Sequence, residues 1–143
     1  MKNIIDKTIE SGDFTIFINA LQEAGLTDIF CSEGPYTVFV PNDDAFNKLP
    51  KNVLKNILKD KERLTEIITY HVLAIKIKSD KVKKMNNVIT VQGSKLEFNG
   101  KKYIKVNNAK IIKKDIECKN GIIHEIDKVL IPEKLIYDKK FIK

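Results

Sequence analysis

The period of the hydrophobic pattern changes along this chain, and that change limits the folds that are open to it. Near the N-terminus, apolar side chains recur at i, i+3, i+4 and i+7, the spacing of one helix face, at Phe14, Phe17, Ile18 and Leu21. Asp13 is placed to cap this helix and Gly25 to end it. From residue 88 on, short runs alternate apolar with polar residues, as strands do: VITV, KLEF, KYIKV, AKII and GIIHEIDKVLI. No repeat or composition break divides the two halves, so we expect one α+β domain over residues 1–143.

Two further helices are predicted in the first half. Pro50 marks the start of one, whose apolar side holds Val53, Leu54, Ile57 and Leu58. Asp60 is placed to cap the next, KERLTEIITYHV. His71 shares a face of that helix with Leu64, Ile67 and Ile68. We therefore expect its ring to point inward, with both nitrogens bonded to nearby backbone or to the turn at 42–44.

Turn residues delimit the predicted strands. The run YTVFVP is β-branched and aromatic, and Pro41 terminates it. In the NDDAF that follows, Asn42 or Asp43 can accept hydrogen bonds from the first free amides of a short helix. Further on, Asn99-Gly100 favours a tight type I′ turn, which predicts an antiparallel hairpin.

In the last predicted strand, IIHEIDKV, positions can be predicted for three of the polar side chains. By alternation His124 shares a face with Ile122 and Ile126, so it should pack in the core or at its rim. Glu125 should then face solvent on the opposite side. Asp127 can tie the end of the strand to a backbone amide.

Lysine dominates the charge of the chain. Basic residues number 26 against 19 acidic ones, the formal charge is +7, and Arg63 is the only arginine. Sites that read nucleic-acid sequence depend on the planar fork of arginine, whereas lysine is a hydrated point charge. Specific nucleic-acid binding is therefore disfavoured.

The lysines of the second half fall in two groups. On one face, both groups together would form a basic patch able to hold an anionic glycan, wall polymer or lipid surface by salt-sensitive attraction. Otherwise they form a solubilising surface. The groups are Lys76, Lys78, Lys81, Lys83 and Lys84, then Lys101, Lys102, Lys105, Lys110, Lys113 and Lys114.

The cysteines and histidines match no metal or catalytic motif. Cys31 and Cys118 are far apart, so we expect free, structural thiols, although a single disulfide stays open. No closely spaced ligand pair suits zinc, and no motif supports a Cys-His nucleophile. Glycine-rich phosphate loops are absent. We expect no enzyme, no metal and no cofactor.

The N-terminal residues do not resemble a secretory signal. Asp6, Glu10 and Asp13 stand where such a signal has an apolar run. No stretch reaches the roughly 18 to 20 apolar residues of a membrane span. We expect a soluble chain with no transmembrane segment, either a mature fragment that has lost its leader or a protein that stays inside the cell.

Three boxes in this sequence resemble those of fasciclin-type domains. The first, YTVFVPNDDAF, is a strand, a proline and an acidic turn that leads to Ala-Phe. The second is Tyr70-His71 within IITYHVL, and the third is NGIIHEIDKVLIP. Their order and spacing cover nearly the whole chain. The structural residues of the first and third boxes are Thr37, Pro41, Asn42, Asp43, Asp44, Phe46, Gly121, His124 and Asp127.

The resemblance implies both a fold and a function. The expected fold is a β-wedge or sandwich-like core with several packed helices, mainly N-terminal. The expected role is non-enzymatic adhesion, or binding of a protein or a cell-surface or matrix component, at the cell surface or outside the cell. The alternative is a binder of anionic polysaccharide or lipid headgroups that uses the lysine-rich face.

The resemblance also suggests binding residues. Tyr70 and His71 match the tyrosine-histidine motif of the family, and Asp115-Ile116 stand where it has an adhesion-linked Asp-Ile pair. Each has a structural alternative. His71 would be a buried histidine, and Ile116, in a strand-like run before a hairpin, would be buried rather than displayed.

Overall fold

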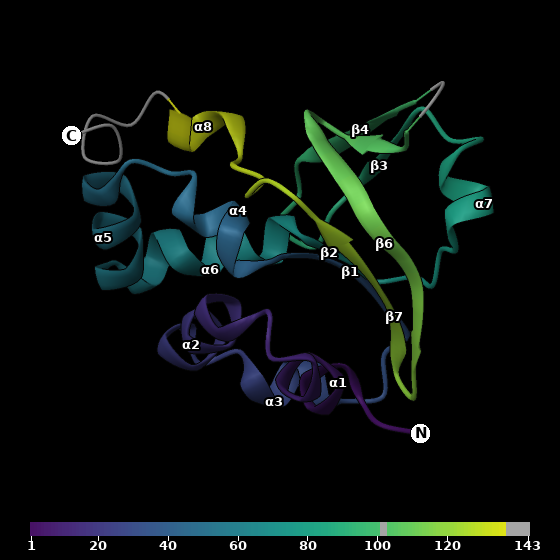
Figure 1. Cartoon of the computed structure of the whole chain (residues 1–143), viewed down its shortest axis with the longest axis horizontal. Coiled ribbons are helices and arrows are strands. Elements are labelled where there is room, and N and C mark those ends of the chain that lie inside the picture. Colours follow the sequence, from purple (N-terminus) through teal and green to yellow (C-terminus); the bar gives the residue numbers. More distant parts are fainter. Residues whose placement is uncertain (101–102, 137–143) are drawn as a thin grey trace.

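The computed structural model of the chain describes residues 1–100 and 103–136. Helices precede and flank one mixed sheet, whose strand order is β2-β1-β7-β6-β5-β4-β3 (Figure 1). The helices are α1 (Ile4–Ser11), α2 (Thr15–Ala24), α3 (Thr27–Cys31), α4 (Asp43–Asn47), α5 (Lys51–Lys59), α6 (Lys61–Tyr70), α7 (Ser79–Val82) and α8 (Glu133–Ile136). The strands are β1 (Tyr36–Pro41), β2 (Val72–Leu73), β3 (Asn87–Ile89), β4 (Lys95–Asn99), β5 (Lys105–Val106), β6 (Ala109–Cys118) and β7 (Gly121–Ile126).

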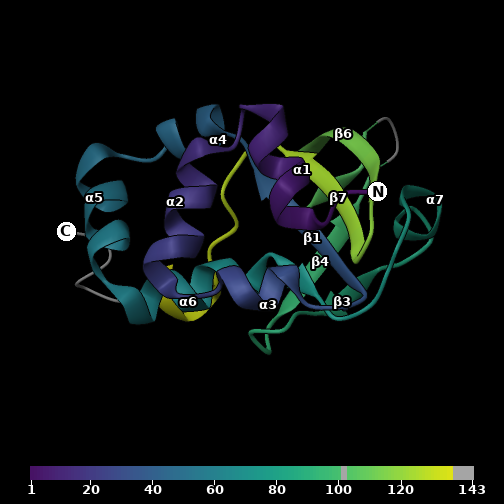
Figure 2. The ribbon, with the colours of Figure 1, turned by 90° about the horizontal axis from the view of Figure 1, so that it is seen from below.

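Helices α1 to α6 form a layer on one side of the sheet, as Figures 1 and 2 show from two directions. Helix α2 packs on α6, and α1 contacts α3 and β7. The apolar face predicted for α2 is buried, because Phe17 and Leu21 are both 1% exposed. The first hydrophobic core lies here, and it joins these side chains to Val38, Val40 and Ile123 of the central strands.

The sheet bends around a second hydrophobic core. The Val91 N–H donates to Val72 O of β2 at 2.9 Å, so the chain after β3 returns to the opposite edge of the sheet. Strand β6 shifts register against β7 between Ile111 and Lys113 and between Lys113 and Ile116. The bend encloses Phe39, Leu73, Leu96, Phe98, Val106 and Ile126. The predicted α+β fold with a wedge-like core is confirmed.

Several predicted helix ends are observed. Gly25 ends α2 in the left-handed conformation, with a φ of 71°. Asp60 caps α6 by accepting the Arg63 N–H at 3.1 Å. Asn42 caps α4 by accepting the Ala45 N–H at 2.8 Å. These caps need only neighbouring residues, which is why the sequence predicts them.

The predicted cap of α2 is wrong. Phe14 stands at the N-cap position, and it makes no capping bond. Instead, Asp43 Oδ1 accepts the Ile16 N–H at 2.8 Å, and the Asp43 N–H donates to Asp13 O at 2.9 Å. Asp43 therefore fixes the start of α2 against the start of α4. Local spacing does not encode this contact, because it joins segments that are distant in the sequence.

The predicted tight turn is also wrong. Strand β4 pairs Asn99 with Lys105 of β5, so Asn99-Gly100 cannot be the centre of a two-residue turn. The two-residue loop is Asn107-Asn108, between β5 and β6. Asn107 has a φ of 53°, which asparagine tolerates better than most residues. Burial of alternate residues along β4 sets the register, and the Asn-Gly dipeptide does not.

Strands β1 and β7 form a parallel pair in the middle of the sheet. Tyr36 lies opposite Gly121, and Pro41 lies opposite Ile126. Both strands are buried along almost their whole length, as is usual for parallel pairs. A Cβ on Gly121 would stand 2.0 Å from Tyr36 O, so only glycine fits at this close approach.

We predict that Gly121→Ala lowers the free energy of unfolding by about 3 kcal/mol, because the backbone must shift to admit a methyl group. Urea denaturation measures the loss. Gly12→Ala is the matched control. Gly12 has a φ of 78°, but among the described residues no atom outside its immediate neighbours lies within 4 Å of an added Cβ. Left-handed strain alone then costs about 1 kcal/mol. Equal losses in the two variants would contradict the steric argument.

Candidate functional site

His71 follows α6 and is 1% exposed. Its Nε2 accepts the Leu130 N–H at 2.9 Å, so its Nδ1–H is the donor to Ile67 O at 2.7 Å. The ring is neutral, and burial lowers its pKa to about 4. The inward orientation predicted from helical phase is confirmed. The partners of the ring are backbone groups and not the turn at 42–44.

Tyr70 is also buried, at 5% exposure, but in the second core. Its hydroxyl donates to Lys95 O at 2.7 Å and accepts from Asn107 Nδ2 at 3.0 Å. Tyr70 therefore ties the end of α6 to β4 and to the loop before β6. The two residues of this motif face different parts of the interior.

His124 is fully buried on β7, as predicted. Its Nδ1 accepts the Asp115 N–H at 3.1 Å, and its Nε2–H donates to Ile77 O at 2.9 Å. The ring stacks on Phe39, with centroids 5.6 Å apart. Burial lowers the pKa of this histidine, which keeps it neutral as well.

Asp115 occupies the irregular part of β6, with a φ of 57°. Its carboxylate accepts the N–H of Ser79 at 2.8 Å and also the Ser79 hydroxyl. Burial raises the pKa of this carboxyl, but the two bonds from Ser79 outweigh it and hold the pKa below its usual value. Asp115 thus joins the bulge of β6 to the start of α7.

The two predicted pairs do not meet in one exposed site. Tyr70 belongs to the second core, whereas Ile116 is half-buried against the first. Within residues 1–100 and 103–136, no hydrogen bond or ion pair links Tyr70-His71 to Asp115-Ile116. The roles of these residues in binding stay predictions.

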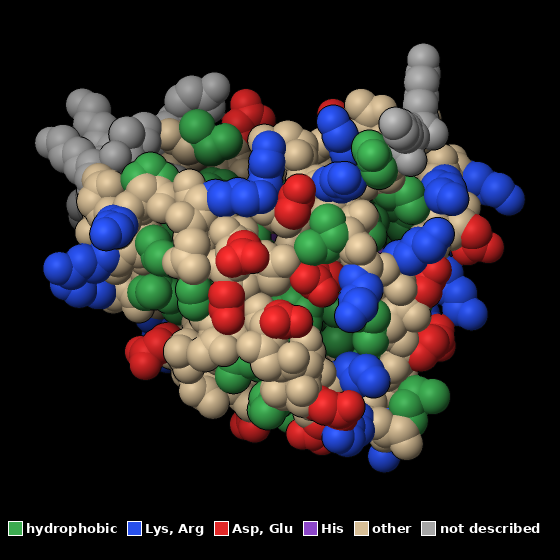
Figure 3. All heavy atoms as spheres, in the orientation of Figure 1, with side chains coloured by type: hydrophobic (Ala, Val, Ile, Leu, Met, Phe, Trp, Pro, Cys, Tyr) green, Lys and Arg blue, Asp and Glu red, His purple; other side chains and the backbone are tan. Residues whose placement is uncertain are grey.

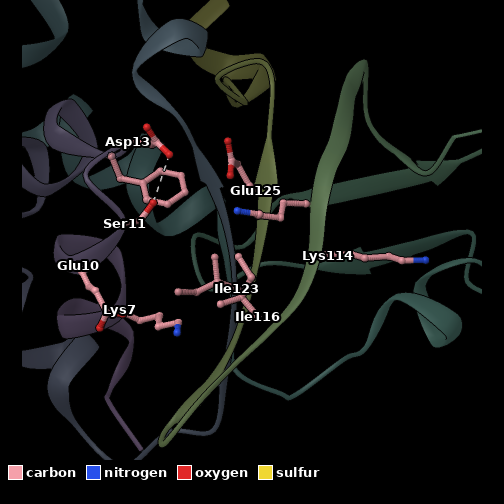
Figure 4. A pocket seen from close by; sticks show the side chains of 10 residues that line it. Lys7, Glu10, Ser11, Asp13, Lys114, Ile116, Ile123 and Glu125 are labelled. Atoms are coloured by element: carbon pink, nitrogen blue, oxygen red, sulfur yellow. Dashed lines mark hydrogen bonds between the residues drawn. The ribbon is translucent and has the colours of Figure 1, made fainter.

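Ile116 lines a hollow of 470 Å³ between α1 and the β6–β7 hairpin (Figure 4). The floor is apolar and consists of Phe14, Ile116 and Ile123. The rim is charged on both sides. Lys7, Glu10, Ser11 and Asp13 come from α1 and the turn after it, and Lys113, Lys114 and Glu125 come from the hairpin.

A second hollow, of 410 Å³, adjoins the first and shares Asp13 and Glu125 with it. Its other lining residues are Asn42, Asp43 and Asp44, so four of its five lining residues are acidic. Glu125 is only 9% exposed, which corrects the expected solvent-facing position. Strand β7 lies between β1 and β6 and is contacted by α1, and all six of its residues are buried, so Glu125 reaches solvent only through these hollows.

Sequence reasoning missed the α1 side of the first hollow. Lys7, Glu10 and Ser11 carry no motif, and only the packing of α1 on β7 brings them here. The signal that could have pointed to this region is the acidic run of the first box, because Asp43 and Asp44 line the adjoining hollow.

A sequence model of the Fasciclin domain matches residues 12–132 of the chain. The chain belongs to the fasciclin family. It is 37% identical over 131 residues to uncharacterized protein sll1735 of Synechocystis sp., a match that covers 92% of this chain and 98% of that protein. It is 33% identical to transforming growth factor-beta-induced protein ig-h3 of Sus scrofa, over 92% of this chain and 20% of that protein. Its fold matches a solved FAS1 domain pair from the insect cell adhesion molecule fasciclin I, with a TM-score of 0.68 and 26% identity, over 90% of this chain and 50% of that one.

In this fasciclin domain two of the signature residues, Thr37 and Asp127, tie separate segments together through hydrogen bonds. The Thr37 hydroxyl donates to Ile75 O at 2.6 Å and accepts the Ile77 N–H at 2.8 Å. Asp127 Oδ1 accepts the Lys110 N–H at 2.8 Å, which confirms the predicted tie at the strand end. The remaining signature residues lie in or beside β1, α4 and β7: Pro41, Asn42, Asp43, Asp44, Phe46, Gly121 and His124.

Part of the lysine charge of the fasciclin domain is neutralised locally. Lys76 Nζ lies 3.0 Å from a Glu117 oxygen, and Lys78 Nζ lies 3.7 Å from the other. Lys110 Nζ lies 3.7 Å from the centre of the Tyr103 ring. Lys113 and Lys114 line the first hollow. Lys101 and Lys102 fall outside the described residues.

The thiols of the domain are unpaired, as expected. Cys118 is buried, but Cys31 is exposed, so only one of the two packs as an apolar residue. Across the described ranges, no group of three or more histidine, cysteine or acidic side chains could hold a metal ion. No helix among those residues is long and apolar enough to cross a membrane.

We predict that the free energy of unfolding falls by about 2 kcal/mol through His71 between about pH 7.5 and pH 5. The folded pKa of about 4 lies below the ordinary value of 6.5, so the unfolded state takes up the proton first. The stabilisation is complete above pH 6.5 and is lost as the pH falls towards 4. His124 adds a loss of the same sign.

Urea denaturation at several pH values tests this. In His71→Gln the slope over the same window should shrink, whatever the change in absolute stability. A stability that is constant between about pH 7.5 and pH 5 would contradict neutral, buried rings.

We predict that Asp115→Ala lowers the free energy of unfolding by about 3 kcal/mol, whereas Asp115→Asn costs less than about 1 kcal/mol. Alanine loses both bonds from Ser79 and is strained at a φ of 57°. Asparagine tolerates that conformation and keeps an acceptor for the Ser79 N–H. Thermal and urea unfolding measure both variants, and similar losses in the two would show that the bulge does not depend on this side chain.

Proposed function

We propose that this chain is a non-enzymatic adhesion or protein-binding module that acts at the cell surface or outside the cell. The observation that carries the proposal is the match over 90% of the chain to fasciclin I, an insect cell adhesion molecule. The partner is a protein or a cell-surface or matrix component.

The buried polar groups support binding over catalysis. Both ring nitrogens of His71 and of His124 are engaged by backbone groups, so neither ring is free to act as a base. Burial raises the pKa of the Cys118 thiol to about 11, which keeps it protonated and unreactive near neutral pH. These three side chains are therefore unsuited to act as a base or a nucleophile.

Beads coated with the folded protein are expected to attach to the cells that produce it, and to lose that attachment when the cells are first treated with protease. Flow cytometry counts the attached beads, and beads coated with serum albumin are the control. Attachment no greater than that of albumin beads would contradict the proposed function. Attachment that survives protease but disappears with added salt would favour an anionic polymer as the partner.

A further inference from the structure

The two hollows adjoin at Asp13 and Glu125, which line both, and we name the pair of hollows the Glu125 groove. One end is lined by carboxylates and Asn42. The other end has the apolar floor of Phe14, Ile116 and Ile123. Figure 3 shows this side of the molecule, with acidic side chains gathered in the middle and lysines towards β6.

Glu125 is the feature that points to a ligand. Glu125 as a residue is only 9% exposed, and its side chain faces into the first hollow (Figure 4). Oε2 accepts a hydrogen bond from Asn42 Nδ2 at 2.9 Å. Oε1 has no hydrogen-bond or ion-pair partner in the part of the chain that the structure describes, and it is not fully buried, so it is open to the hollow. Lys113, its neighbour in register, makes no ion pair with it within those residues.

A carboxylate that is largely removed from water and lacks a cation gains more from a cationic partner than an exposed one does. The second hollow adds Asp13, Asp43 and Asp44 around the same space. One oxygen of Asp43, Oδ1, already accepts the Ile16 N–H. The formal net charge of the chain is +7, so this acidic hollow has a charge opposite to that of the molecule as a whole. It suits one lysine or arginine side chain, and arginine can bond a carboxylate through two N–H groups at once.

We propose that the Glu125 groove binds an extended segment of a protein partner in which an arginine or lysine is flanked by aliphatic residues. The cation lies against Glu125 in the acidic hollow, and an aliphatic neighbour covers the floor at Ile116 and Ile123. The inference rests on the proposed protein-binding function and names the surface and the chemistry of the partner.

The test is a titration of the full isotope-labelled chain with acetyl-Leu-Arg-Leu-amide, followed by NMR. Saturable shifts are expected at the amides of Phe14, Ile116 and Glu125. The charge-reversed peptide acetyl-Leu-Glu-Leu-amide should produce none there. Equal binding of the two peptides, or saturable shifts confined to another face, would overturn the proposal.

Glu125→Gln removes the charge while the glutamine oxygen can still accept from Asn42. We expect this substitution to weaken the binding of the arginine peptide about ten-fold or more, because a charge-assisted hydrogen bond at a largely buried residue is lost. Glu23→Gln is the matched control, since Glu23 is exposed on α2 and lines neither hollow. It removes the same charge, and screening should keep its effect below about two-fold.

Asp44→Asn keeps the inference testable if Glu125→Gln fails to fold. Asp44 is exposed in the second hollow, and the loss of its charge should weaken the binding of the arginine peptide about three-fold. If Glu125→Gln and Asp44→Asn both fold and bind like Glu23→Gln, the groove is not the site. Beads that attach to cells equally well with Glu125→Gln would refute the groove and leave the proposed function standing. If the peptide binds as expected but the beads do not attach to cells, the groove stands and the proposed function is refuted.

Discussion

The parallel pairing of β1 with β7 is the constraint on which the rest of the fold depends. It joins the first and third sequence boxes at the centre of the sheet, and at Gly121 the two backbones come too close for any side chain. Asn120, one residue earlier, makes hydrogen bonds here through both the oxygen and the nitrogen of its side-chain amide. Its Oδ1 accepts the Ile4 N–H, and its Nδ2 donates to Phe30 O and Ser32 O. The start of α1 and the end of α3 are therefore fixed by the turn that leads into β7.

Two neutral histidines then hold irregular segments against this frame. His71 supplies an acceptor for Leu130 in the chain after β7, and His124 supplies one for the bulge at Asp115 and a donor for Ile77. These backbone groups lie outside regular pairing and would be costly to bury alone. An aliphatic side chain could fill the same volume but could not satisfy them. Both histidine rings must be neutral to make these bonds, because a protonated ring has no nitrogen that can accept a hydrogen bond.

Local features of the fold could be read from the sequence, and long-range ones could not. Helical phase predicted the burial of His71, and single residues such as Asn42 and Gly25 predicted helix ends, because each signal acts within one turn of chain. The cap of α2 by Asp43 depends on a segment that is distant in the sequence. The groove depends on three such segments at once. The alternating pattern of β7 led to the wrong prediction that Glu125 faces solvent. A period of two separates the two faces of a strand, but it does not show which face a helix covers.

The same distinction bears on what family motifs mean for binding. Tyr70, His71 and Asp115 each hold two or more segments together through hydrogen bonds, so a substitution there acts on the fold before it acts on any partner. Loss of adhesion in such a variant does not by itself identify a contact. Recognition needs groups that reach solvent and are not already satisfied within the chain. Glu125 meets both conditions at one carboxylate oxygen, although its neighbours on β7 are buried, and this is why a single strand of the domain can serve the core and a binding surface together.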